Sequence, residues 1–332
     1  MSAPDRDPVA QIQMMSGGFF LSRCLQVAAE LGIADLIADV PVSAAQLAAT
    51  TGSSADALGR ILSLLCAHGV FERRDGGFAH TEVSRFLRCD HPTSMRSFAR
   101  MFGNPVFWQS VIRLDESVAS GEPMAEKVTP GGLWQYLAEH KDRSEVFNQT
   151  MAAKARAMVP LVPRAYDFSR FARVADIGGG RGHLLQAILA ASPNSRGVLF
   201  DQPHVVREVA SLAGERLVLE CGNFFEDALP EADVYVLMEV IHDWDDPSAE
   251  RILRAVRRAA PAGAKLLIVE AKMPDPPLAC WTATLDIVML NLVGGRQRGF
   301  GEYTTLLERS GFGEIREIPM GMGYSMIEAS PA

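Results

Sequence analysis

The amino-acid sequence predicts an α/β protein in which a mostly helical N-terminal part precedes a parallel β-sheet. From residue 172 onward, short runs rich in Val, Leu and Ile alternate with helical segments, which is typical of a parallel sheet covered by helices on both faces. Residues 9–100 instead carry apolar residues at helical spacing. The 332 residues give room for about two domains of roughly 150 residues each.

The composition argues against several classes of function. Hydrophobic residues make up 48% and charged residues 22%, as in ordinary globular proteins. No apolar run approaches the roughly 18 residues of a membrane helix, and "MSAPDRDPVA" lacks a basic and then apolar signal pattern. The net charge of -8 argues against a general affinity for nucleic acid. Five scattered cysteines show neither zinc-ligand nor disulfide spacing, so we expect a cytoplasmic protein.

Within residues 1–100, two helical segments and a hairpin follow one another. Gly52 separates "VSAAQLAATT" from "SSADALGRILSLLCAHG", and Asp75-Gly76-Gly77 supplies the turn of the hairpin. This order is a winged-helix pattern. A DNA-binding module needs a recognition helix with basic and amide side chains, whereas the second helix offers only Arg60. A transcription regulator is therefore the less favoured interpretation, and packing or dimerisation is favoured.

The apolar content of residues 10–40 exceeds what one thin helical layer can bury, which favours a homodimer. Residues 101–165 form a linker that is rich in aromatic residues and methionine. This linker is either a helical core that joins two domains or the wall of an apolar pocket. For the pocket, the candidate residues are Trp134, Phe147 and Met151.

The strands and helices of the second half follow in a regular order. We expect strands at 173–178, 196–201, 216–222, 233–240 and 264–271, with helices at 182–192, 204–214, 247–260 and 301–312. Two consecutive short strands at 314–320 and 323–330 then predict an antiparallel hairpin at the edge of the sheet.

A glycine-rich turn lies between the first strand of the sheet and its helix. "VADIGGGRGH" has the spacing G-x-G-x-G, and His183 stands where a dinucleotide fingerprint would need its third glycine. Asp176 precedes the turn, and Asp201 ends the second strand, where a carboxylate can accept hydrogen bonds from ribose hydroxyls. Together these features predict a cofactor that contains adenosine. The missing glycine disfavours a nicotinamide dehydrogenase.

These motifs resemble a known family. "DIGGGRGH", "LFDQPHVV", "CGNFFEDALPEADVYVLMEVIHDWDD" and "LLIVEAKMPD" are similar to the S-adenosylmethionine-dependent O-methyltransferases of the plant caffeate and flavonoid type and their bacterial natural-product relatives. The resemblance runs from about residue 15 to residue 328. It implies a methyltransferase of secondary metabolism, such as antibiotic biosynthesis, which acts on a hydroxyl of a small aromatic or polyketide-like metabolite.

The resemblance also implies a division of the chain. Residues 1–100 are expected to form a winged-helix dimerisation domain, residues 101–165 a helical linker that lines the substrate pocket, and residues 166–332 a Rossmann-like class I methyltransferase domain. S-adenosyl-L-methionine is the implied cofactor. The candidate cofactor-binding residues are Asp176, Gly178, Gly180, Asp201, Asn223, Phe224 and Met238.

The stretch "EVIHDWDD" supplies the candidate chemistry. A phenol with a pKa of about 10 is roughly one part in a thousand ionised at pH 7, and a histidine is suited to remove its proton. In the family the matching histidine, His242 here, is the general base, and Glu270 matches one of two acids that orient it. Asp243 is expected to face substrate or cofactor, while Asp245 or Asp246 caps the helix that begins at Pro247.

Three positions depart from the family pattern. Gln297 replaces the second acid, Met238 replaces a common lysine, and Asn223 replaces an aspartate that contacts adenine. A glutamine can hydrogen-bond the imidazole but cannot balance the charge of an imidazolium. A C- or N-methyltransferase, or a relative that no longer transfers methyl groups, is therefore the alternative.

The apolar helix "WTATLDIVMLNLVGG" is either a core helix or, as the resemblance implies, a wall of the substrate pocket. Its candidate pocket residues are Asp286, Met289 and Asn291, and Gln297 follows them. No metal is expected, since no His, Asp and Glu cluster has ligand spacing. The expected partners are a small aromatic or polyketide-like substrate and a second copy of the chain, without nucleic acid or membrane.

Overall fold

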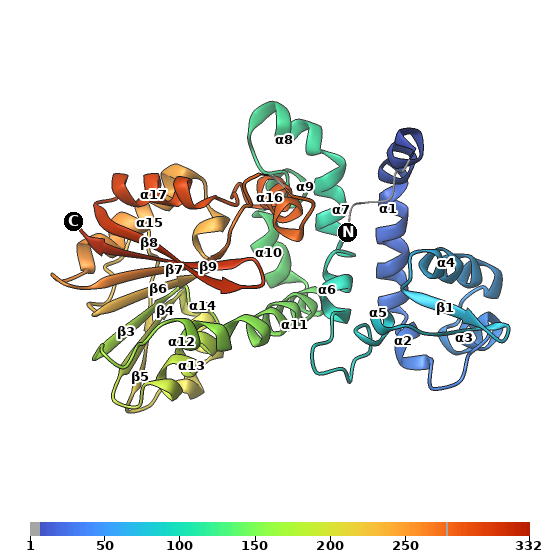
Figure 1. Cartoon of the computed structure of the whole chain (residues 1–332), viewed down its shortest axis with the longest axis horizontal. Helices are drawn as coiled ribbons and strands as arrows, with labels where there is room; N and C mark the ends of the chain where they lie inside the picture. Colours follow the sequence, from blue (N-terminus) through green and yellow to red (C-terminus); the bar gives the residue numbers. More distant parts are fainter. Residues whose placement is uncertain (1–6, 277) are drawn as a thin grey trace. The chain divides into compact units, whose positions relative to one another are not determined.

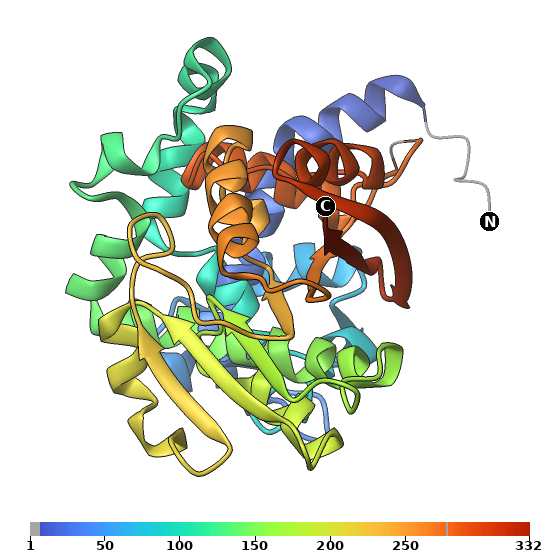
Figure 2. The same ribbon diagram turned by 90° about the vertical axis from the view of Figure 1, so that its left-hand side faces the viewer.

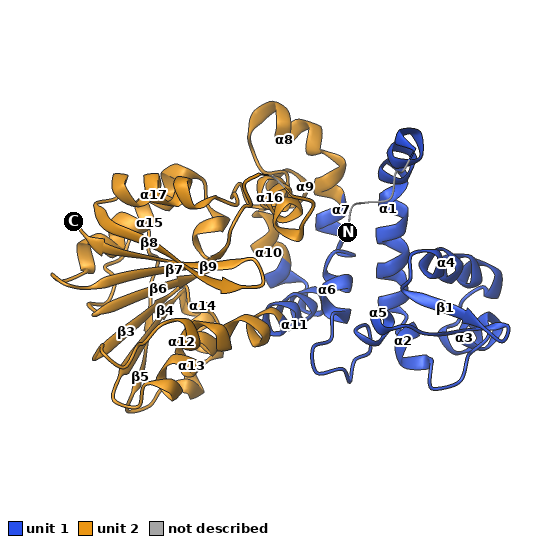
Figure 3. Cartoon of the chain, viewed as in Figure 1, with its two compact units in different colours: residues 1–108, 137–153 blue, residues 109–136, 154–332 orange. Residues whose placement is uncertain are grey.

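The computed structural model describes residues 7–276 and 278–332. The chain forms two compact units, shown in Figure 3: residues 1–108 with 137–153, and residues 109–136 with 154–332. This division differs from the predicted boundaries at residues 100 and 165, because the helices between them are shared between the two units. Each unit is described separately below.

The first unit contains the helices and the hairpin expected near the N-terminus. Its elements are α1 (Pro8–Glu30), α2 (Ile33–Leu36), α3 (Ala44–Thr51), α4 (Ala55–Ala67), β1 (Phe71–Arg74), β2 (Gly77–His80), α5 (Glu82–Arg85), α6 (Arg96–Met101), the start of α7 (Pro105–Ile112) and most of α11 (Lys141–Met158). Ser43 and Gln46 form a capping box at the start of α3, and Gly52 ends that helix with a positive φ of 67°. Helix, helix and hairpin follow one another as predicted.

The second unit is built on a seven-stranded sheet with the order β5-β4-β3-β6-β7-β9-β8. Its strands are β3 (Arg173–Ile177), β4 (Arg196–Asp201), β5 (Leu217–Cys221), β6 (Val234–Met238), β7 (Lys265–Ala271), β8 (Phe312–Gly321) and β9 (Tyr324–Pro331). The first five are parallel, whereas β9 runs antiparallel to both β7 and β8. The predicted α/β class and the antiparallel C-terminal hairpin, red in Figure 2, are confirmed.

Helices cover both faces of this sheet (Figure 1). Along β6, Tyr235 and Leu237 belong to the buried cluster that contains α15 (Asp246–Ala259) and α17 (Phe300–Arg309). Val234 and Val236 belong to the cluster of α12 (Val162–Ala165) and α13 (His183–Ala191) on the opposite face. This alternation is the period-2 geometry of a strand buried on both sides. The helices and turns of this unit are the end of α7, α8 (Leu114–Ser120), α9 (Ala125–Val128), the start of α10 (Gly132–Glu139), the end of α11, η1 (Val159–Leu161), α12 (Val162–Ala165), α13 (His183–Ala191), α14 (Pro203–Glu208), η2 (Ala210–Leu212), η3 (Ile241–Asp243), α15 (Asp246–Ala259), α16 (Trp281–Leu292) and α17 (Phe300–Arg309).

The order of the strands places the predicted motifs at one edge of the sheet. The connections after β3 and β6 leave from neighbouring parallel strands, and β3 is paired with β4 on its other side. Ligands bind at such a switch point, outside the carboxyl ends of the strands. The glycine loop after β3, Asp201 at the end of β4, η3 after β6 and Glu270 near the end of β7 all lie at this edge. No helix among the described residues is long and apolar enough to cross a membrane.

The packing of α15 against the sheet predicts a large effect of truncating its core residues. Leu253 on α15 is fully buried, whereas Val218 on the edge strand β5 is 48% exposed. Because the cavity would be lined by packed side chains, Leu253→Ala should lower the free energy of unfolding by about 2–5 kcal/mol. The control Val218→Ala should cost about 1 kcal/mol or less. Urea denaturation of both variants measures the difference, and equal losses would contradict this packing.

Candidate active site

The glycine loop after β3 has a backbone that requires glycine. Gly178 and Gly180 have positive φ values of 71° and 54°. Residues with a Cβ rarely adopt such values, whereas glycine adopts them readily. A Cβ on Gly178 would lie 2.9 Å from Cγ2 of Val240, whereas a Cβ on Gly180 would meet no atom within 4 Å. The backbone N–H of Gly180 donates to Oδ2 of Asp201 at 2.8 Å. The loop is thus tied to the end of β4 and is open above Gly180.

Two carboxyls lie beside this loop. Asp176 is buried, and its Oδ2 has no hydrogen-bond partner among the described residues. Burial, together with the nearby charge of Asp201, raises the pKa of Asp176 to about 7. Burial also raises the pKa of Asp201, although backbone N–H groups of Gln202 and Gly180 oppose that shift. An unpartnered buried oxygen, an open glycine and a second carboxyl fit a ligand that carries several hydroxyl or amine donors.

The other candidate cofactor residues surround the same edge. Oδ1 of Asn223 accepts from the N–H of Phe225 at 3.0 Å, which fixes the turn after β5. The ring of Phe224 packs edge-on against Trp244, with 5.8 Å between ring centroids. Met238 is half-buried at the end of β6 and packs against the cluster of α12 and α13. Trp244 was not among the predicted site residues, although it stands within the "EVIHDWDD" stretch.

His242 lies on the short turn η3 and is buried. Oε1 of Glu270 accepts from the backbone N–H groups of Ile241 at 3.0 Å and His242 at 3.3 Å. Oε2 of Glu270 lies 3.6 Å from Nδ1 of His242. The side-chain amide of Gln297 lies closer, with 2.6 Å between Nε2 and Nδ1. The structure therefore brings together the predicted base His242, the predicted acid Glu270 and Gln297, which stands where the family pattern has a second acid.

Charges around the imidazole set its proton affinity. Oδ1 of Asp243 lies 3.4 Å from Nε2 of His242. Burial lowers the pKa of His242, but the carboxyls of Glu270, Asp243 and Glu239 raise it more, so the net pKa is above the ordinary value. Burial raises the pKa of Glu270 to about 7, and the nearby imidazole only partly opposes this.

A buried arginine that the sequence reasoning missed holds the same turn from its other side. Arg298 donates to the carbonyl oxygens of Ile241 at 3.1 Å and Trp244 at 2.9 Å. Its guanidinium also contacts Oδ1 of Asp246 at 2.7 Å. Arg298 directly follows Gln297 in the sequence. The family motif around position 297 was therefore the signal that could have pointed to Arg298. The predicted helix cap is confirmed, since Asp245 accepts from the N–H of Ser248 at 2.9 Å.

The predicted pocket residues of α16 point to different surroundings. Asp286 accepts from the backbone N–H of Gln297 at 2.7 Å, which ties α16 to the histidine site. Asn291 is buried and donates to Ser110 O at 3.1 Å and Ser117 Oγ at 3.2 Å, so its amide serves helix packing. Met289 is half-buried.

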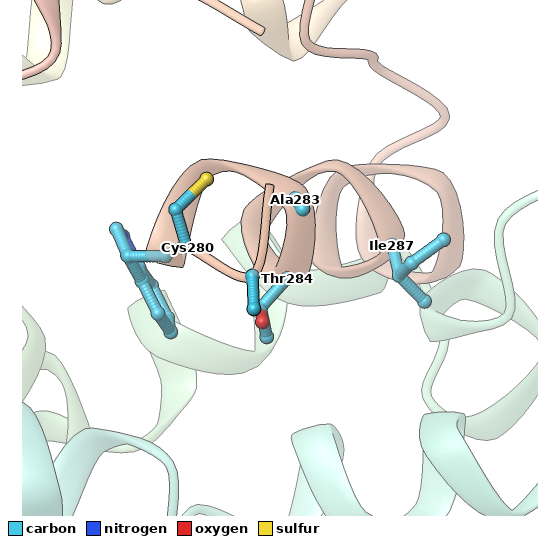
Figure 4. A pocket seen from close by; sticks show the side chains of 6 residues that line it. Cys280, Ala283, Thr284 and Ile287 are labelled. Atoms are coloured by element: carbon cyan, nitrogen blue, oxygen red, sulfur yellow. The ribbon is translucent and has the colours of Figure 1, made fainter. Parts of the chain in front are cut away.

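A different stripe of α16 faces open space. A hollow of about 780 Å³ is lined by Ala279, Cys280, Trp281, Ala283, Thr284 and Ile287, of which Figure 4 labels four. Cys280, Ala283, Thr284 and Ile287 have the spacing i, i+3, i+4 and i+7, which places them on one face of the helix. None of these lining residues was named from the sequence, and the role of α16 as a wall of the substrate pocket stays a prediction.

The three linker candidates are divided between the units. Phe147 and Met151 lie on the part of α11 that belongs to the first unit, whereas Trp134 is exposed on the part of α10 that belongs to the second. Their place in a substrate pocket stays a prediction. Within residues 7–276 and 278–332, no group of three or more His, Cys, Asp or Glu residues could hold a metal ion.

Comparisons with known proteins match nearly the whole chain. A family model for an O-methyltransferase domain matches residues 112–313, and a model for an O-methyltransferase dimerisation domain matches residues 13–89. The phenazine O-methyltransferase PhzM of Lysobacter antibioticus is 40% identical over 96% of this chain and 95% of its own. The mitomycin biosynthesis 6-O-methyltransferase of Streptomyces lavendulae is 36% identical over 92% of this chain and 89% of its own.

A solved structure shares the fold. Human N-acetylserotonin methyltransferase, determined in complex with S-adenosylmethionine, has a TM-score of 0.86 and 26% identity to this chain, and the match covers 99% of each chain.

The contacts of Arg298 predict that it keeps the η3 turn in place. Arg298→Met would remove the guanidinium donors from the carbonyl oxygens of Ile241 and Trp244, and Ile241 O would keep only the N–H of Trp244 at 3.2 Å. A buried polar group that is left unsatisfied costs about 1–3 kcal/mol. We expect lower stability in urea and faster amide hydrogen exchange in residues 241–246. Arg296→Met is the matched control, because the Arg296 side chain is exposed and, among the described residues, its guanidinium pairs with Asp246 and Glu302. Equal exchange in the two variants would rule out the bracing role.

Proposed function

The chain belongs to the family of S-adenosylmethionine-dependent O-methyltransferases, and we propose that His242 is the general base with which it methylates a hydroxyl of a small aromatic or polyketide-like metabolite. The observation that carries this proposal is the buried imidazole of His242 with Glu270 and Gln297 at Nδ1. These groups lie at the same sheet edge as the glycine loop. Hydroxyphenazines are the first substrates to examine, because a relative is a phenazine O-methyltransferase.

S-adenosylmethionine supplies a methyl group that the positive charge of its sulfonium already activates. The chain must therefore supply alignment and a deprotonated nucleophile. We propose that Asp176, Gly178, Gly180 and Asp201 hold the cofactor, with Asn223, Phe224 and Met238 around it. The open side of Gly180 and the unpartnered Oδ2 of Asp176 support this assignment.

The base must present an unprotonated nitrogen to the hydroxyl group. If Nε2 is that nitrogen, Nδ1 carries a proton and needs an acceptor. The amide nitrogen of Gln297 can only donate, whereas its Oε1 is buried and has no partner within the described part of the chain. We propose that the amide turns over in the working enzyme so that Oε1 accepts from Nδ1–H. Glu270 Oε2, 3.6 Å from Nδ1, is the second acceptor on this side of the ring.

Asp243 is assigned to the substrate side of the imidazole. Its Oδ1 is 3.4 Å from Nε2 of His242, which is the nitrogen that would take the proton. The side chain is only half-buried, so it can meet a substrate there. We propose that the hollow along α16, which is lined by Trp281 and Ile287, is part of the substrate site and gives it an apolar wall. Asp286 and Met289 on the same helix remain candidate substrate residues.

We propose a homodimer in a reducing compartment such as the cytoplasm. The N-terminal match to a dimerisation domain supports the dimer. So does α1, which exposes the apolar side chains of Val9, Ile12, Met15, Phe19 and Phe20. All five cysteines are free, which suits a reducing compartment.

Replacing the proposed base tests this mechanism. His242→Ala should lower turnover of hydroxyphenazines or other phenols by about 10²–10⁴-fold, while S-adenosylmethionine still binds in calorimetry. His68→Ala, at an exposed helix end, is the control. Near-normal turnover by His242→Ala would remove the base assignment. Product analysis by mass spectrometry and NMR locates the methyl group on oxygen, nitrogen or carbon.

The pH dependence of the wild-type enzyme follows from the same assignment. The base works only when it is unprotonated, so kcat/KM should rise with pH through a pKa above 6.5, since the surrounding carboxyls raise that of His242. Glu270→Gln removes the carboxyl that raises this pKa most, so it should move the acid limb to lower pH. An unchanged limb in Glu270→Gln would show that another group titrates.

The cofactor assignment is tested at the end of β4. Asp201→Ala removes the acceptor of the Gly180 N–H and the carboxylate proposed to bind ribose hydroxyls, so affinity for S-adenosylmethionine should fall by at least about tenfold. Calorimetry measures this loss, with NAD as the competing ligand. The control Asp233→Ala changes an acid that binds the Arg173 backbone at the opposite end of the sheet. Binding of NAD in preference to S-adenosylmethionine would overturn the assignment.

A further inference from the structure

Position 297 leaves the histidine with one acid fewer than the family pattern, yet the charges of three other carboxyls act on the imidazole. They come from Glu270, Asp243 and Glu239. Burial raises the pKa of both Glu270 and Asp243, which lie against the two nitrogens of the ring. Glu239 behaves differently. Burial raises its pKa, but Lys154 and then His242 lower it more, so the net pKa is below the ordinary value.

The position of Glu239 is fixed from three elements. It follows the last residue of β6 and has a positive φ of 55°, which is uncommon for a residue with a side chain. Its N–H donates to the carbonyl oxygen of Val269 on β7 at 3.0 Å. Oε1 contacts Nζ of Lys154 on α11 at 2.5 Å and accepts from Oη of Tyr324 on β9 at 2.6 Å. A strained backbone that is held by several contacts often marks a functional residue.

The ion pair with Lys154 does not cancel the effect of Glu239 on the histidine. Glu239 raises the pKa of His242, and the opposing effect of Lys154 is smaller. The side chain of Glu239 is 16% exposed, so little water screens its charge. Asp243 on η3, Glu270 on β7 and Gln297 before α17 contact the imidazole of His242. Glu239 stands three residues before His242 in the connection after β6, and its charge and that of Lys154 act on the imidazole through space.

We propose that Glu239, held by Lys154 and Tyr324, is the carboxylate that balances the positive charge of His242 when the imidazole takes the substrate proton, in place of the acid that is absent at position 297. This inference rests on the proposed function of His242. The hydroxyl proton moves to Nε2, the oxygen–methyl bond forms, and the sulfonium–methyl bond breaks to leave a neutral thioether. Glu239 touches none of the reacting atoms in this scheme, so it is a positioning residue that acts through the charge of the imidazole.

The isosteric variant Glu239→Gln tests the proposal because it removes the charge and keeps the shape. We expect the plateau value of kcat to fall by up to about tenfold for each pKa unit by which His242 becomes less basic. The acid limb of kcat/KM should move to lower pH. NMR titration of the imidazole, assigned with His242→Ala, measures the same pKa without substrate.

A second substitution supplies the decisive comparison. If the two positions serve one purpose, Gln297→Glu should restore kcat and the pKa of His242 in the Glu239→Gln background. Glu317→Gln is the matched control, because Glu317 also binds a lysine and a hydroxyl, Lys272 and Ser325, but lies on β8. It should leave both readouts unchanged.

Two results would overturn the proposal: an unchanged pKa of His242 in Glu239→Gln, or a double variant no better than Glu239→Gln alone. Failure of the proposed function looks different. In that case His242→Ala retains turnover, whatever the NMR titration shows for Glu239.

Discussion

Glu270 accepts hydrogen bonds from the N–H groups of Ile241 and His242 with the same carboxyl that faces the His242 ring. These N–H groups belong to the turn after β6, whereas Glu270 belongs to β7, which pairs with β6 in register. The distance between base and acid is therefore set by strand pairing in the sheet. Because this carboxyl is buried, its loss would leave two backbone donors without acceptors in the core.

The opposite side of the η3 turn is held by the segment that ends in Arg298. The guanidinium of Arg298 binds the carbonyl oxygens of the turn, and the N–H of Arg296 donates to the carbonyl oxygen of His242 at 2.9 Å. Gly295 lies so close to this carbonyl that a side chain there would overlap it. Gln297 stands between these anchored residues, so its amide reaches the imidazole from a fixed backbone. One segment thus supplies both the brace and the hydrogen-bond partner.

Sequence periodicity predicted the α/β class, the glycine loop, the helix cap at Asp245 and the antiparallel hairpin, since each depends on local residue patterns. It could not predict contacts between distant segments. Asn291 read as a pocket residue because a polar side chain on an apolar helix needs a partner, and that partner is backbone and hydroxyl from residues 110 and 117. Glu239 contacts Lys154 and Tyr324, each of which lies 85 residues away in the sequence. No rule of sequence spacing predicts such contacts. The predicted cofactor and substrate contacts themselves stay predictions.

The path of the chain through its two units limits how such a protein can be recombined. Residues 109–136 belong to the second unit although the segments on both sides of them belong to the first, and α11 begins in one unit and ends in the other. A crossover at one junction would give each product at least one unit whose core combines segments from both parents. Exchange of a whole unit between relatives needs three coordinated junctions, near residues 108, 136 and 153. New specificity in this architecture is therefore more accessible through single substitutions inside a unit than through domain shuffling.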